Sequence, residues 1–329
     1  MQVGISAEKD LARAGGLIQQ IADNVESVII GKRPSVELAL IALMSQGHIL
    51  IEDSPGVGKT MFARALAKSL GCTFKRIQFT ADLLPSDITG SSVYSQKTDD
   101  FEFRQGPVMA QIVLADEINR ATPKVQSALL ECMGEKQVSV DGTTYAMPRP
   151  FHVIATQNPM EYEGTFPLPE NQLDRFLIRI TLGYPSRDNE VAILASQQFD
   201  HPIDRVVEVA PASDLLWLQE LVKTVFVDGL VKQYIVSVVA ATRESPQVAV
   251  GVSPRGSLGL FRTSQARAIL QGRDYVLPDD VKALAVPVLS HRLVLRIGTH
   301  NEIKTGQAVI AGVLDAVPVP GARPSFKKK

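Results

Sequence analysis

The chain has few cysteines, and none of its histidines are grouped. Its 329 residues include two cysteines, Cys72 and Cys132, and five histidines. The cysteines lie after and within apolar helical patterns and lack metal-like spacing. This arrangement predicts small buried hydrophobes in a reducing cytosol rather than a disulfide framework. The histidines have no ligand-like spacing either, and we expect them to be structural or at the surface.

The chain also lacks an excess of charge of one sign and lacks long apolar runs. The 34 Lys and Arg residues balance 35 Asp and Glu residues, for a formal net charge of -1. No large basic field is available for nucleic acid, so no such partner is expected. Apolar stretches end well short of the roughly 18 residues of a membrane span. The N-terminus lacks the pattern of a signal peptide. These absences predict a cytoplasmic protein without a membrane span, and the Lys327–Lys329 run predicts a solvated end.

The first half of the chain alternates short apolar segments with helical patterns. This rhythm is typical of an α/β fold whose mainly parallel sheet has helices on both faces. Two stretches, residues 91–103 and 137–147, instead alternate around a polar turn and predict β-hairpins; the second carries Asp141-Gly142. Strands are expected at residues 48–53, 75–79, 112–117, 151–157 and 177–182.

After about Gly183 the pattern becomes helical throughout. Five segments begin near Ser, Asp or Pro and continue with helical periodicity. We therefore predict two domains. Residues 1–182 form an α/β core with two hairpin insertions, and residues 183–329 form an all-helical domain that frays from about Val317.

A glycine-rich loop follows the first expected strand. Its glycines allow backbone N–H groups to surround phosphates, and the helix after it adds a partial positive charge. Lys59 is suited to the β and γ phosphates of ATP, and Thr60 to Mg²⁺. Asp53 stands where the strict motif has its first glycine. A chance Gly-Lys-Thr at a strand–helix turn is the alternative, which the flanking strand and helix disfavour. The predicted site comprises Ser54, Pro55, Gly56, Val57, Gly58, Lys59, Thr60 and Met61.

Within the segment Val113–Arg120, an apolar strand ends in two carboxylates. Charges at a strand end are costly unless they are solvated, paired or liganded. Asp116 is suited to hold Mg²⁺ and Glu117 to activate the attacking water. A strand end that has simply reached solvent is the other interpretation of these residues. Together with the phosphate loop, the pair predicts ATP hydrolysis.

A further strand, VIATQNP, ends in Asn158, whose amide is suited to the attacking water or the γ-phosphate. Here the chain resembles AAA+ ATPases, and the resemblance assigns Asn158 to the sensor 1 position. It also implies that Arg175, in LPENQLDRF, is an arginine finger acting on a neighbouring subunit. Arg255, in GVSPRGSLGL, matches the sensor 2 arginine of the helical lid. The VIIG segment resembles the turn that holds adenine, which makes Ile30 and Gly31 candidates.

Each of these assignments has a simpler structural alternative. Arg175 would form a surface salt bridge with Asp174 or Glu170 if its string stood alone. The segment around Arg255 also fits a helix-capping stretch that begins at Ser253. Apolar packing explains Ile30 and Gly31 nearly as well as adenine binding does.

The resemblance is most specific for the MoxR branch of AAA+ proteins. It extends from about Asn24 to Leu295 and includes IEDSPGVGKT, RIQFTADLLPSDITG, LADEINRATPKVQSALLECMGEKQVSVDG and GRDYVLPDDVKALAVPVLSHRL. The two hairpin insertions mark the group that contains this branch. The resemblance implies a homo-oligomeric, hexameric ring that remodels, matures or activates a protein client, often with a von Willebrand factor A domain partner.

Other functions remain open at this stage. A magnesium-chelatase subunit shares the insertions, and its genomic neighbours would identify it. A nucleic-acid motor of the MCM kind is disfavoured by the near-zero net charge and the missing DNA-binding motif. A nucleotide switch without hydrolysis is disfavoured by the presence of Glu117.

Overall fold

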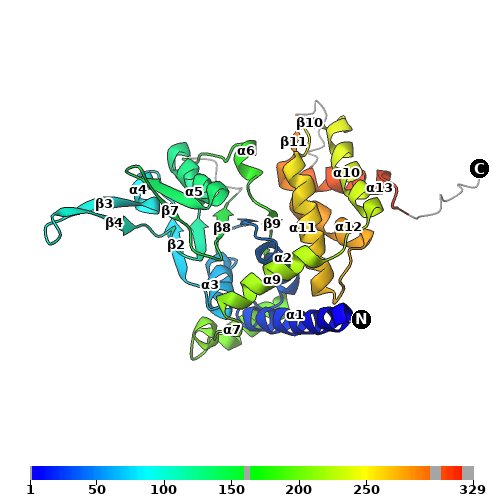
Figure 1. The fold of residues 1–329 in the computed structure, drawn as a ribbon, viewed down its shortest axis with the longest axis horizontal. Helices are drawn as coiled ribbons and strands as arrows, with labels where there is room; N and C mark the ends of the chain where they lie inside the picture. The colour runs from blue at the N-terminus through cyan, green and yellow to red at the C-terminus, as the bar shows by residue number, and fades with distance from the viewer. Residues whose placement is uncertain (1, 159–163, 297–304, 321–329) are drawn as a thin grey trace, which may run out of the picture. The chain divides into compact units, whose positions relative to one another are not determined.

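The protein folds into two compact units. The computed structural model describes residues 2–158, 164–296 and 305–320 (Figure 1). One unit is Arg13–Glu220, and the other contains the described residues up to Ala12 and from Leu221 onward. We call them the core unit and the lid unit. The sequence-based boundary at residues 182–183 stays a prediction, and in the structure residues 183–220 pack within the core unit. The predicted Lys327–Lys329 end and His300 lie outside the described residues.

A five-stranded parallel sheet forms the centre of the core unit, in the order β2-β5-β8-β1-β9. Alternate residues of its strands, such as Leu50, Val113 and Val153, pack in one cluster with the helix residue Leu129. Residues of the other parity, such as Ile49, are buried as well, so both faces are covered. The strands are β1 (Ile49–Glu52), β2 (Phe74–Gln78), β5 (Ile112–Asp116), β8 (His152–Gln157) and β9 (Ile178–Ile180).

The strand order determines which loops lie together. β8 pairs with both β1 and β5, and all three strands run parallel. Their carboxyl ends therefore meet at one edge of the sheet, which is where open α/β sheets bind ligands. The core-unit helices are α2 (Arg33–Met44), α3 (Lys59–Ser69), α4 (Pro85–Thr89), η1 (Ile118–Arg120), α5 (Pro123–Glu135), α6 (Glu170–Leu173), α7 (Arg187–Ser196) and α8 (Pro202–Arg205), while α1 (Gln2–Glu26) and α9 (Ala212–Thr224) run past the boundaries of this unit.

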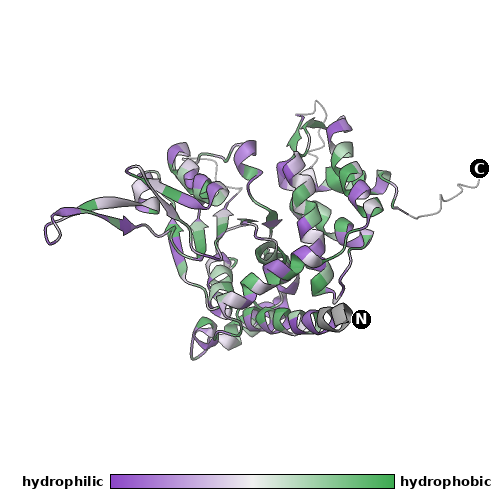
Figure 2. Cartoon of the chain, viewed as in Figure 1, coloured by the Kyte–Doolittle hydropathy of each residue, from purple (hydrophilic) through white to green (hydrophobic). Residues whose placement is uncertain are grey.

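Both segments expected to form hairpins are two-stranded antiparallel sheets. The first joins β3 (Gly90–Ser95) to β4 (Asp100–Gln105) and extends away from the central sheet (Figure 1). Its loop end is hydrophilic (Figure 2). The second joins β6 (Gln137–Val140) to β7 (Thr143–Ala146) through Asp141 and Gly142, which both have positive φ, as tight hairpin turns require. The rings of Phe103 and Tyr145 stack at 4.0 Å and connect the two hairpins.

The lid unit is mainly helical. Its helices are α10 (Gly229–Glu244), α11 (Pro254–Leu270), α12 (Pro278–Leu289), η2 (Ser290–Arg292) and α13 (Gly306–Ala316). Our expectation of an all-helical domain missed one antiparallel pair, β10 (Val248–Val250) with β11 (Val294–Leu295). Strands of three and two residues are too short for an alternating pattern to be recognised in the sequence.

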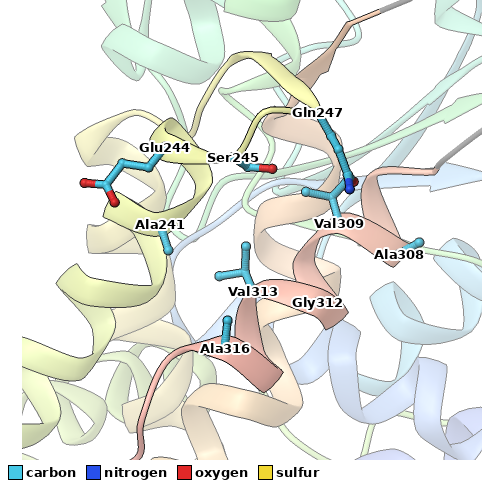
Figure 3. Close-up of a pocket in the computed structure, with 9 residues that line it drawn as sticks. All are labelled: Ala241, Glu244, Ser245, Gln247, Ala308, Val309, Gly312, Val313 and Ala316. Carbon is cyan, nitrogen blue, oxygen red and sulfur yellow. The ribbon is translucent and has the colours of Figure 1, made fainter. Parts of the chain in front are cut away.

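A groove of about 480 Å³ lies between α10 and α13 of the lid unit (Figure 3). Small side chains dominate its walls, and none of the residues predicted to handle nucleotide lines it. The lining comprises Ala241, Glu244, Ser245, Gln247, Ala308, Val309, Gly312, Val313 and Ala316.

The two cysteines differ in burial. Cys132 is buried in α5, as expected, whereas Cys72 is only partly buried because it lies in the turn after α3. Burial raises the pKa of both thiols to about 12, so neither is a thiolate near neutral pH. Among the described residues, no helix is long and apolar enough to cross a membrane.

Two buried histidines hold the amino end of β8. His48 Nδ1 accepts from the Val153 amide at 2.9 Å, and His48 Nε2 lies 3.3 Å from the Met133 carbonyl, to which it donates. His152 Nδ1 donates to the Gly47 carbonyl at 2.9 Å. Each ring is neutral in this arrangement. Burial lowers the pKa of His48 to about 3 and that of His152 to about 4.

These neutral histidines make folding sensitive to acid. Below about pH 6.5 an unfolded histidine binds a proton, whereas the folded rings stay neutral until about pH 4. The unfolded state therefore gains protons first, and stability falls as the pH drops from about 6.5 to 4. We expect a loss of about 2 kcal/mol per histidine at pH 5. Urea unfolding at pH 7.5 and pH 5 measures the loss.

A matched variant tests the cause. In His48→Asn with His152→Asn, the shorter amides keep one hydrogen-bonding group near each Nδ1 position but cannot titrate. Their loss of stability between pH 7.5 and pH 5 should be clearly smaller than that of the wild type. His201→Asn is the control, because His201 is an exposed residue. An equal loss in the double variant and the wild type would assign the acid sensitivity to other groups.

Candidate active site

The glycine-rich loop lies between β1 and α3. Gly56 and Gly58 have φ values of 83° and 92°, which residues with a β-carbon rarely adopt. Helix α3 begins at Lys59, and no side chain caps its amino end. The first amides of a helix lack partners within the helix and carry a partial positive charge. The loop therefore has the backbone geometry of a phosphate-binding site.

Asp53, which replaces the first glycine of the motif, anchors this loop. Its Oδ1 accepts from the Ser54 amide at 2.9 Å. Its Oδ2 accepts from the amides of Leu182 and Gly183 at 2.7 and 2.6 Å. The carboxylate therefore ties the start of the loop to the chain leaving β9. Lys59 Nζ donates to the Asp53 carbonyl at 2.6 Å, within the same loop.

Asp116 ends β5 beside the loop. Its Oδ1 accepts from the Thr156 hydroxyl at 2.6 Å, and its Oδ2 lies 3.5 Å from Thr60 Oγ1. Arg76 also donates to Oδ2, from Nε at 2.9 Å and from Nη2 at 2.6 Å. A hydroxyl and a carboxylate oxygen this close together fit Mg²⁺, which takes few protein ligands and keeps several waters.

Glu117 follows Asp116 in an unusual backbone conformation. Its φ of 57° places it in the left-handed region, at a cost of roughly 1–2 kcal/mol for a residue other than glycine. Its amide donates to Thr156 Oγ1 at 2.9 Å. Its Oε2 accepts from Gln78 Nε2 at 2.7 Å and lies 3.2 Å from Arg120 Nη1. The carboxylate is therefore oriented by two side chains.

Four residues of this arrangement were missed in the sequence. Arg76 and Gln78 lie on the edge strand β2, and Thr156 lies inside β8, where it bridges Asp116 and the Glu117 amide. We noted Asp53 only as a departure from the motif. Arg76, Gln78 and Thr156 belong to no residue pattern with fixed spacing, so their roles depend on strand register. The contacts of Asp53 depend on the pairing of β1 with β9.

Asn158 comes directly after β8 and is buried, with 6% of its surface exposed. Because β8 lies between β1 and β5, this position falls at the same sheet edge as the phosphate loop and Asp116. The structure therefore brings Asn158 to the predicted edge.

The turn before α2 contains the residues predicted to hold adenine. A β-carbon placed on Gly58 would lie 3.9 Å from Ile29 Cδ1. Ile29 is buried, whereas Ile30 is half-buried. Gly31 has a φ of 72°, and a β-carbon there would lie 2.0 Å from Asn189 Nδ2, so a larger residue would collide with α7. The side chain of this turn that approaches the phosphate loop is therefore Ile29, and binding of adenine by Ile30 and Gly31 stays a prediction.

The two predicted arginines lie in different units. Arg175 Nη1 donates to the Leu130 carbonyl of α5 at 2.7 Å. A β-carbon on Gly134 would lie 2.4 Å from the same nitrogen, so α5 is small where the guanidinium packs. Arg255 belongs to the lid unit and is exposed in the first turn of α11, where its amide donates to Ser253 Oγ at 3.2 Å. The capping stretch considered as its alternative is therefore present.

Comparison with known families defines the class of protein. Residues 48–178 match the "ATPase family associated with various cellular activities (AAA)", and residues 240–312 match the "AAA lid domain". The first match includes the phosphate loop, the acidic strand end and Asn158, and the second includes Arg255. With its parallel sheet and helical lid, the chain is an AAA+ ATPase family member.

Individual relatives narrow the family. The chain is 51% identical to "Uncharacterized protein YeaC" of Bacillus subtilis, over 94% of this chain and 97% of that protein. It is 45% identical to "Chaperone MoxR1" of Mycobacterium tuberculosis, over 90% and 80%. The crystal structure of "a putative ATPase" from Cytophaga hutchinsonii superimposes with a TM-score of 0.89 at 38% identity, covering 97% of this chain and 99% of the other. The chain belongs to the MoxR family of AAA+ ATPases.

Proposed function

We propose that the chain binds Mg·ATP at the carboxyl edge of its sheet and hydrolyses it. One observation carries this proposal. The neighbouring strands β1, β8 and β5 bring the phosphate loop, Asn158, and the Asp116–Glu117 pair to one edge. The short distance between Thr60 Oγ1 and Asp116 Oδ2 supports a metal ion between them.

Each residue has a distinct role in this proposal. Backbone amides from Ser54 to Met61 surround the phosphates, and Lys59 exchanges the Asp53 carbonyl for phosphate oxygens. Thr60 and Asp116 hold Mg²⁺, which when bound neutralises phosphate charge. Glu117 accepts the proton of the attacking water, and Asn158 orients that water or the γ-phosphate.

We further propose that activity depends on assembly into a homo-oligomeric, hexameric ring. Arg175 would act at the ATP site of the adjacent subunit, where a guanidinium neutralises transition-state charge. In this chain its Nη1 donates to the Leu130 carbonyl, so the guanidinium is held against α5. Arg255 would contact the nucleotide from the lid.

The purpose of hydrolysis is proposed to be chaperone-like remodelling of a protein client. The name of the Mycobacterium tuberculosis relative, "Chaperone MoxR1", supports this proposal. We also propose a partner protein with a von Willebrand factor A domain for this remodelling. The extended β3–β4 hairpin, with the exposed rings of Tyr94 and Phe101, is a candidate client contact.

Lys59→Ala tests the nucleotide site directly. We expect ATP affinity to fall at least about tenfold, because the variant loses a charge-assisted contact to phosphate. Calorimetric titration with ATP and Mg²⁺ measures the affinity. Lys68→Ala at the other end of α3 is the control, because Lys68 Nζ donates to the Ile203 carbonyl. Unchanged binding in Lys59→Ala would contradict the proposed site.

A further inference from the structure

A positively charged side chain, that of Arg76, already donates hydrogen bonds to Asp116, the proposed metal ligand. Arg76 lies on β2 next to β5, and its Nε and Nη2 both donate to Oδ2 of Asp116, at 2.9 and 2.6 Å. The Arg76 side chain is 47% exposed, whereas that of Asp116 is only 10% exposed. The guanidinium therefore approaches a nearly buried carboxylate from the solvent side.

The contact involves the oxygen that a metal would need. Asp116 Oδ1 accepts from the buried Thr156 hydroxyl at 2.6 Å. Oδ2 is the oxygen that lies 3.5 Å from Thr60 Oγ1. A divalent ion shared by Thr60 and Asp116 therefore competes with Arg76 for Oδ2. Two cations on one oxygen also repel each other.

We propose that Arg76 is a positioning residue that neutralises and orients Asp116 in the nucleotide-free protein and is displaced from Oδ2 when Mg²⁺ enters with the nucleotide. This inference rests on the proposed function. The isolated Asp116 carboxylate would be costly at its nearly buried position, and the guanidinium removes that cost. Displacement is feasible because the arginine reaches solvent directly. Arg76 therefore sets the magnesium concentration at which the site fills.

A second role for Arg76 would have a different signature. An arginine that bound the phosphates directly would strengthen nucleotide binding whether or not Mg²⁺ was present. An arginine that holds Asp116 makes Mg²⁺ binding weaker and leaves metal-free nucleotide binding unchanged. The magnesium dependence of binding separates these two roles.

The experiment measures binding of a non-hydrolysable fluorescent ATP analogue while Mg²⁺ is titrated at fixed analogue concentration. In Arg76→Met we expect the half-saturating Mg²⁺ concentration to fall about three- to tenfold, the size expected for a half-exposed pair with two charge-assisted bonds. Affinity measured in EDTA should stay within about twofold of the wild type. Arg76→Lys keeps the charge but loses the two-pronged contact, so it should fall in between.

Lys75→Met is the matched control. Lys75 is exposed on the same strand, so the variant removes the same charge one residue away, where β-strand alternation points it to the other face. We expect its magnesium dependence to match the wild type. Thermal unfolding monitored by circular dichroism establishes that each variant is folded. If Arg76→Met does not fold, Arg76→Lys alone is used to test the proposal.

The outcomes are distinguishable. An unchanged or increased half-saturating Mg²⁺ concentration in both Arg76 variants overturns the proposal. A loss of affinity in EDTA overturns it in favour of direct phosphate binding. If the wild type binds no analogue at any Mg²⁺ concentration, the proposed ATPase function fails, whatever Arg76 does.

Discussion

Replacing Glu117 with Gln is expected to lower ATP turnover at least about 100-fold while ATP binding is retained. The amide has the same shape as the carboxylate but accepts no proton from water. Its oxygen still accepts from Gln78 Nε2, which lies 2.7 Å from Glu117 Oε2 in the wild type, so the local geometry should survive. Steady-state phosphate release and calorimetric ATP titration measure the two properties.

The control for this variant is Glu135→Gln at the end of α5, which removes an exposed carboxylate away from the sheet edge. It should leave turnover unchanged. Turnover of Glu117→Gln within about threefold of the wild type would remove Glu117 from the chemistry, and a wild type without turnover would revive the idea of a nucleotide switch.

The same variant provides a trap for the client. A stalled Glu117→Gln protein should retain a bound protein in ATP and release it when ATP is removed. Lys59→Ala is the matched comparison, because at an ATP concentration below its weakened affinity the site stays mostly empty and little client should be retained. Equal retention by both variants would show that the captured protein binds independently of nucleotide.

Replacing Arg175 with Ala should lower turnover about 1,000-fold with ATP affinity unchanged, which is the effect of removing an arginine finger. Arg175→Lys should recover little activity, because a lysine does not reproduce the planar fork. Arg205→Ala, which removes an exposed arginine of the core unit, is the control and should be fully active.

A mixing experiment separates a role in the neighbouring subunit from a structural role. Arg175 Nη1 also donates to the Leu130 carbonyl, so its loss could disturb α5 within the same subunit. If the finger acts between subunits, mixing Arg175→Ala with Lys59→Ala should restore part of the activity. An intact phosphate loop then meets an intact arginine at some interfaces. A mixture as inactive as its components would contradict action in trans.

Much of the proposed nucleotide site could be predicted from the sequence, because each of its parts is a short contiguous string. The Gly56–Thr60 loop, Asp116–Glu117 and Asn158 each follow an apolar strand, and strand ends are recognisable without knowing their neighbours. The two hairpins were visible for the same reason, since alternation around a polar turn is local. The family resemblance, confirmed by the comparisons, also depends on such strings.

Other features required the tertiary structure. The interactions of Arg76, Gln78 and Thr156 with the acidic pair arise because β2 and β8 pair with β5, and no sequence spacing specifies that register. Asp53 reaches Leu182 and Gly183, about 130 residues away along the chain, because β9 pairs with β1. The short β10–β11 pair and the packing of residues 183–220 within the core unit were also unpredictable from local patterns.

The proposed site for Mg·ATP therefore has two sources. Local backbone rules, such as glycine at positive φ and a helix that starts at Lys59, are written in neighbouring residues. The partners that hold Asp116 and Glu117 come from separate strands, because hydrogen bonds between side chains depend on distance in space. The order of the residues along the chain does not specify that distance.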